Sequence, residues 1–93
     1  MRNYEAVVVV DPRLDEPAIS QAVDRFTKVI GSKGEVTRLD RWGRRRLAYE
    51  INHLTEGFYV VAAFKAEPNL VSELDRLFEI GEEYIRAKVV RVP

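Results

Sequence analysis

The sequence predicts an α+β fold in which two helices cover one face of a four-stranded antiparallel sheet. Two observations predict it. Strand-like and helix-like segments follow in the order strand, helix, strand, strand, helix, strand, which is the split βαβ arrangement. The second half of residues 3–10, and residues 58–65, are apolar on both faces of the strand, as central strands are. The connections from one strand through a helix to the next strand are right-handed. Both helices are therefore expected on one face of the sheet, with strands two and four at its edges.

The first strand is expected over residues 3–10, because the branched side chain of valine suits a pleated sheet. A helix follows, with Asp15 as its predicted N-cap and Glu16 and Pro17 in its first turn. Its apolar face has helical spacing and comprises Ile19, Ala22, Val23, Phe26, Val29 and Ile30. The stretch from Gly31 to Gly34 is expected to end this helix.

A long strand with one irregularity is expected from Glu35 to Ile51. Val36 and Trp42 occupy even-numbered positions, whereas the large apolar residues from Leu47 on occupy odd-numbered ones, so the two groups would face opposite sides of a regular strand. A single inserted residue near Gly43 would reconcile the two halves, because an extra residue reverses the facing of everything after it. We therefore expect a bulge or bend at Gly43, which glycine tolerates.

The second half of the chain has the same order of elements, strand, helix and strand, without a repeat in its sequence. Residues 52–57 are expected to form a turn, residues 58–65 a strand, and residues 84–92 the last strand. Between them a helix begins at Pro68 and ends at Gly81. Its apolar side comprises Leu70, Val71, Leu74, Leu77 and Phe78.

Length and composition indicate one domain, residues 1–93, in the cytoplasm. Lys and Arg together number 15, and Asp and Glu together also number 15, so the net charge is zero. A nucleic-acid function must therefore rest on local clusters of basic residues. The chain has no cysteine, which removes disulfides and thiol chemistry. Its amino terminus lacks the long apolar region of a signal peptide, and no apolar run is long enough to span a membrane.

Both central strands carry apolar residues on both faces, so one set must lie on the sheet face that the helices leave uncovered. A large exposed apolar patch usually marks a binding surface, and we expect one here. The alternative is that loops or a second copy of the chain cover this face.

Enzyme chemistry finds little support in the sequence. GSKGEV, residues 31–36, lacks the frame of a phosphate-binding loop and is more typical of a helix end. His53 is the only histidine, so neither a metal site nor a base for Ser20, Ser32 or Ser72 is indicated. We expect no catalysis, metal, cofactor or small-molecule substrate. Two alternatives on the same fold are an acylphosphatase-like enzyme and a small-molecule regulatory domain, but fold alone does not carry function.

The most distinctive feature is a basic cluster in which Asp40 is the only local acid. It comprises Arg38, Arg41, Arg44, Arg45 and Arg46. Arginine suits phosphate because its planar fork donates two parallel hydrogen bonds. Strand alternation would point Arg44 and Arg46 to one side and Arg45 to the other. The cluster therefore predicts contact with RNA or an acidic partner, although arginines on an edge strand also prevent sheet-to-sheet aggregation.

Aromatic side chains offer a second signal of RNA binding. Tyr4, Phe58 and Tyr59 lie on the two strands whose aromatics stack bases in RNA-recognition motifs, although core packing is the favoured role for at least one of Phe58 and Tyr59. Trp42 could stack on a base or anchor packing. Arg2 and Arg91 add positive charge near the chain ends.

Four stretches together resemble the bacterial small-subunit ribosomal protein six family. The opening MRNYEAVVVVDPRLDE is similar to the start of that family, and RWGRRRLAYEI is similar to its most recognisable segment. EGFYVV resembles the aromatic strand that follows, and YIRAKVVRV resembles the closing strand. The resemblance runs nearly end to end with the same order and spacing.

The resemblance implies a ferredoxin-like fold, a place in the small ribosomal subunit, binding to the central domain of 16S ribosomal RNA, and pairing with small-subunit ribosomal protein eighteen. The family signature matches Arg45 to Tyr49 most directly, and the family's amino terminus matches Arg2 and Tyr4. The residues expected to bind RNA or the partner are Arg2, Tyr4, Arg41, Trp42, Arg44, Arg45, Arg46, Tyr59 and Arg91.

Overall fold

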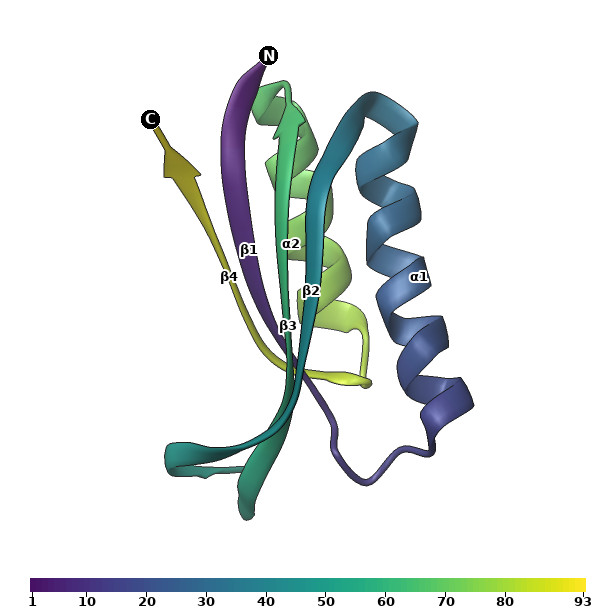
Figure 1. Cartoon of the computed structure of the whole chain (residues 1–93), viewed down its shortest axis with the longest axis vertical. Coiled ribbons are helices and arrows are strands. Elements are labelled where there is room, and N and C mark those ends of the chain that lie inside the picture. Colours follow the sequence, from purple (N-terminus) through teal and green to yellow (C-terminus); the bar gives the residue numbers. More distant parts are fainter.

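A computed structural model describes all 93 residues and confirms the predicted order of elements (Figure 1). The strands are β1 (Arg2–Val10), β2 (Gly34–Ile51), β3 (Leu54–Ala66) and β4 (Tyr84–Val92), and the helices are α1 (Glu16–Lys33) and α2 (Pro68–Ile80). All neighbouring strands are antiparallel in the order β2-β3-β1-β4. The central and edge positions are therefore those predicted.

The core lies between the helices and one face of the sheet. Alternate residues of the two central strands are buried there, and Val8 and Val60, which oppose each other in the ladder, have no exposed surface. Phe26 from α1 and Leu74 from α2 are also fully buried against them. Every second residue of the strands is thus buried against the residues that recur about every 3.6 positions on the helices, as the apolar spacing predicted.

The predicted start of α1 and its predicted end between Gly31 and Gly34 are both confirmed. The Asp15 carboxylate accepts a hydrogen bond from the Ala18 amide at 2.9 Å, which satisfies one of the free donors of the first turn. The helix then continues through Gly31 and ends at Lys33. Gly34 follows where a Cβ atom would lie 2.4 Å from the Lys65 carbonyl oxygen, so only glycine lets the chain enter β2 this close to β3.

The predicted bulge near Gly43 is present. Arg41 opposes Val60 and Gly43 opposes Tyr59, which leaves Trp42 as an extra residue, and Gly43 has a φ of +83° that favours glycine. A single insertion does not describe the strand, however. A second register shift leaves out Thr37, and its hydroxyl instead donates to the Ala63 carbonyl at 3.1 Å.

The turn after β2 is shorter than the predicted residues 52–57. Ile51 opposes Leu54, so only Asn52 and His53 connect the strands, with φ values of 49° and 65°. A two-residue loop with both φ values positive matches the right-handed twist of the strands it joins. Residues 44–57 consequently form a ribbon, which we call the hairpin arm, that bends away from the helices (Figure 1).

The sheet face opposite the helices, here called the open face, was expected to lack any cover from this chain, and that expectation is wrong at one end. Gly57 lies beneath three apolar side chains: a Cβ there would be 2.2 Å from Val9, 3.4 Å from Leu47 and 3.6 Å from Ile85. Val9 and Leu47 are accordingly buried, with 3% and 8% of their surface exposed. The hairpin arm brings Leu47 across the open face and closes this second, smaller apolar cluster.

Two glycine substitutions are expected to change stability in opposite directions. Gly57→Ala places a methyl group against the buried Val9 side chain and should destabilise the protein by about 1–3 kcal/mol. Gly31→Ala, at a helical position with nothing within 4 Å, should stabilise it by about 0.5–1 kcal/mol. Urea unfolding of both variants measures the difference. Equal stabilities would show that the contact at Gly57 is relieved by movement of the arm.

Candidate functional site

The hairpin arm carries three arginines without a carboxylate partner. The ladder places Arg44 and Arg46 opposite Phe58 and Glu56 on the helix side, while Arg45 points to the open face, as predicted. Arg44 donates to the Pro12 carbonyl at 3.1 Å, and the Arg45 guanidinium lies 5.6 Å from the centre of the Trp42 ring. All three side chains are exposed, so the arm presents positive charge on both sides.

Two members of the predicted cluster are neutralised within the chain. Arg38 donates to the Asp40 carboxylate at 2.6 Å, which is the local acid identified from the sequence. Arg41 turns to the helix side, pairs with Glu16 of α1, and lies over the Phe58 ring at 5.2 Å. Glu16 was missed because it lies 25 residues away in the chain. Within the predicted cluster, the arginines without a carboxylate partner are therefore only the three on the arm.

The aromatic candidates fall into two groups. Tyr4 and Phe58 face the helices and are each 7% exposed, with Tyr4 stacked on Phe64 at 5.5 Å between ring centres. The structure thus assigns Tyr4 to core packing and corrects its expected place on an accessible surface. Trp42 has half of its surface exposed, and Tyr59 lies half-buried on the open face.

A shallow depression of about 230 Å³ lies at the centre of the open face. Its lining consists of Val7, Val9, Tyr59, Arg86 and Lys88. The expected apolar patch is therefore small and has a cationic border. Arg86 and Lys88 were not predicted as site residues, because the side of the sheet that they face follows from the register of β4 on β1.

The arm makes a side-chain contact with β4, the strand at the opposite edge of the sheet. The Arg86 guanidinium donates a hydrogen bond to the Tyr49 hydroxyl and lies 5.7 Å from the centre of that ring. Tyr49 belongs to β2 and Arg86 to β4, which are the two edge strands. This contact holds the arm over the end of the open face where Leu47 packs.

A charged loop supports the base of the arm. The Arg13 amide and guanidinium donate three hydrogen bonds of 2.7–3.0 Å to Asp11, which is largely buried. These hydrogen bonds, acting against desolvation, hold the pKa of Asp11 below its usual value. Pro12, whose carbonyl receives Arg44, lies between the two residues. The ion pair therefore fixes the loop that orients the first arginine of the arm.

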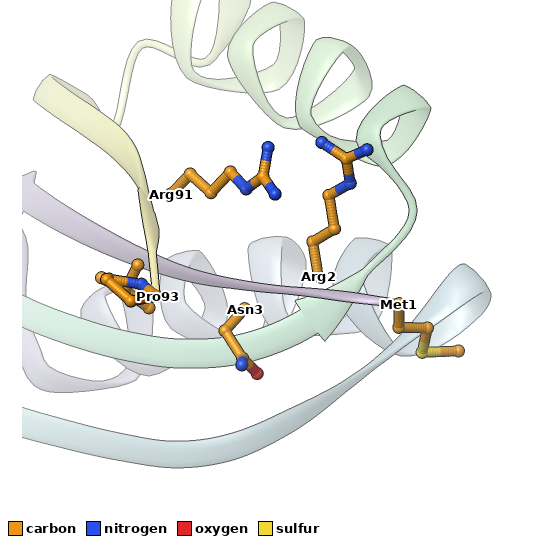
Figure 2. Close-up of a pocket in the computed structure, with 6 residues that line it drawn as sticks. Met1, Arg2, Asn3, Arg91 and Pro93 are labelled. Atoms are coloured by element: carbon orange, nitrogen blue, oxygen red, sulfur yellow. The ribbon is translucent and has the colours of Figure 1, made fainter.

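The remaining candidates, Arg2 and Arg91, lie together at the opposite end of the sheet. They line a cleft of about 460 Å³ formed by the two chain ends (Figure 2). Neither side chain has an ion pair or hydrogen bond within the chain. The structure thus divides the predicted site residues between the arm, the part of β2 that precedes it, the open face, the core and this cleft.

The fold and these surfaces define a ferredoxin-like α+β protein that carries a projecting cationic hairpin. No three metal-binding side chains are grouped together, and neither helix has the length and apolarity needed to cross a membrane.

The comparisons with known proteins agree on one family. The family model described as ribosomal protein S6 matches residues 3–91. Small ribosomal subunit protein bS6 of Desulforamulus reducens is 46% identical and covers 98% of this chain and 97% of its own length. The bS6 protein of Mycolicibacterium paratuberculosis is 49% identical, with 98% and 96% covered. The crystal structure of 30S ribosomal protein S6 from Thermotoga maritima matches with a TM-score of 0.93 at 30% identity, covering 98% of this chain and 87% of that one.

The chain belongs to the ribosomal protein S6 family. This confirms the resemblance seen in the sequence and the ferredoxin-like fold that it implied. The relatives are named as ribosomal proteins and not as enzymes, so the prediction of a non-enzymatic protein is also confirmed.

Asp11→Asn is expected to lower the melting temperature at pH 7, because the ion pair to Arg13 is lost while an acceptor oxygen remains. A carboxyl group whose pKa is lowered by folding stabilises the protein above its unfolded pKa of about 4 and loses that effect as pH falls through the folded value. The gap between wild type and variant should therefore close between about pH 5 and pH 2. Thermal melts across that range measure it, and a constant gap would contradict the assigned charge effect.

Proposed function

We propose that this chain is a structural protein of the small ribosomal subunit that works in the cytoplasm during translation. In this proposal it binds the central domain of 16S ribosomal RNA together with small-subunit ribosomal protein eighteen. Membership of the S6 family supports the place in the ribosome. The observation that carries the RNA contact is the set of three exposed arginines on the hairpin arm that no carboxylate neutralises.

The arm has the chemistry that phosphate recognition needs. A guanidinium group donates paired hydrogen bonds to phosphate oxygens, and these charge-assisted bonds are stronger than neutral ones. Arg45 faces one side of the ribbon while Arg44 and Arg46 face the other, so the arm can lie between two phosphate groups. Such contacts position a protein on RNA without reading its sequence.

The open face is the proposed contact for the protein partner. Val7 and Tyr59 supply apolar surface at its centre, and Arg86 and Lys88 supply a charged border. An apolar centre with a polar rim is the usual anatomy of a protein interface. The neutral net charge of the chain also fits a protein that shares its RNA site with a more basic companion.

RNA binding by the chain alone should be weak, and protein eighteen should strengthen it by roughly tenfold or more, within the usual range of coupling between two ligands. The balance of 15 basic and 15 acidic residues motivates this expectation. A central-domain RNA fragment titrated with and without the partner measures the coupling. Equal affinities in the two titrations would exclude the cooperative mechanism.

Replacing Arg44, Arg45 and Arg46 together with alanine should weaken assembly roughly ten- to hundredfold and reduce the salt dependence by about two to three ions. The matched control is Lys28→Ala/Lys33→Ala/Arg76→Ala, which removes three positive charges from the helices. Filter binding over a KCl series measures both quantities. If the arm variant binds like the control and instead aggregates by light scattering, the arginines protect the sheet edge and do not bind RNA.

A further inference from the structure

The cleft at the chain ends has a geometry suited to one anion. Asn3 opposes Val92 in the ladder and Tyr4 opposes Arg91, so Arg2 and Arg91 are diagonal neighbours on adjacent strands. Both project toward the helix side of the sheet, as the buried Tyr4 does. Figure 2 shows the Arg91 side chain extending toward Arg2, with the two guanidinium groups on the same side of the ribbon.

The two guanidinium groups in this cleft have no ion-pair partner within the chain. Arg2 and Arg91 are both exposed and lack an acidic partner, whereas Glu67 at the start of α2 lies 3.6 Å from the Met1 amino nitrogen. Five other basic side chains of the molecule do have carboxylate partners; these are Arg13, Arg25, Lys33, Arg38 and Arg41. Two neighbouring cations without a counter-charge attract an anion that accepts hydrogen bonds from both.

The lining of the cleft favours phosphate over a protein segment. It consists of Met1, Arg2, Asn3, Arg91, Val92 and Pro93. No aromatic residue and no enclosed apolar floor is present, whereas protein hot spots are built on such pockets. Two planar forks directed into an open cleft match the several acceptor oxygens of a phosphate group.

We propose that the Arg2–Arg91 cleft is a second phosphate-binding site, which takes a backbone phosphate of the RNA that the proposed function assigns to this chain. It is separate from the arm. Arg2 and Val10 are the two ends of β1, and Val10 opposes Phe58, which opposes Arg44. Eight residues of strand at about 3.3 Å each put the cleft about 26 Å from the base of the arm. The protein therefore holds two separate RNA segments, one at each end of its sheet.

The test compares Arg2→Gln/Arg91→Gln with Lys28→Gln/Arg76→Gln, which removes the same charge from the exposed helix surface. Binding of the complex with protein eighteen to the central-domain RNA is measured over a KCl series. The cleft variant should bind roughly five- to tenfold more weakly with a salt slope reduced by about one, and the helix variant should match wild type. Equal behaviour of the two variants would overturn the proposal.

A second measurement separates this site from the proposed function. The free 15N-labelled chain is titrated with inorganic phosphate and, at matched ionic strength, with chloride. Phosphate alone should shift the signals of Arg2, Asn3, Arg91 and Val92, and Arg2→Gln/Arg91→Gln should abolish the shifts. Arg2→Lys/Arg91→Lys, which keeps the charge but not the fork, should retain only part of them. If wild type fails to bind the RNA but shows these shifts, the cleft is a phosphate-binding site and the proposed RNA function is wrong. If phosphate causes no shifts, the proposed phosphate-binding site is wrong.

Discussion

Burial of every second side chain of β1 and β3 beneath the two helices is the constraint on which the rest of the molecule depends. Tyr4, Val8, Val60 and Phe64 occupy that face because a strand turns alternate residues to opposite sides. Their neighbours Val7, Val9, Tyr59 and Val61 are then necessarily on the open face. A one-residue slip would exchange the two sets, so the core that stabilises the fold also decides which residues a partner can reach.

The neutral charge balance conceals an uneven distribution that the fold produces. The pairs of Arg25 with Glu83 and Lys33 with Glu73 join distant segments on the helix side. Exposed pairs of this kind contribute little stability, commonly below about 1 kcal/mol each. Their larger effect is to neutralise part of the positive charge on the helix side, whereas the arginines of the hairpin arm, Arg86 and Lys88 on β4, and Arg2 and Arg91 in the cleft have no carboxylate partner.

Local patterns in the sequence were sufficient for the elements, their order and the helix cap at Asp15, because each depends on residues close together in the chain. The bulge at Gly43 was predicted for the same reason. The second bulge at Thr37 was missed, although Val36 and Leu39 both face the helices while lying three positions apart, because only these two apolar residues mark the change of side. The pairing of Arg41 with Glu16 and the contact of Tyr49 with Arg86 depend on how distant elements lie beside each other, which periodicity does not encode. Tyr4 was misplaced because an aromatic residue on a central strand suits either face.

The contact between Tyr49 and Arg86 lowers the conformational entropy that the arm loses when it binds a ligand. A free two-stranded hairpin is marginally stable in water, and a ligand that ordered it would lose binding free energy to the lost conformational entropy. Here the Arg86 side chain and the packing of Leu47 over Gly57 order the ribbon beforehand. Its three arginines are thus presented at a fixed angle to the sheet. The side chains of the open face therefore hold the arm in place. A substitution that loosens the packing of Val9, Ile85 and Leu47 would consequently weaken the binding of a ligand to the arginines of the arm.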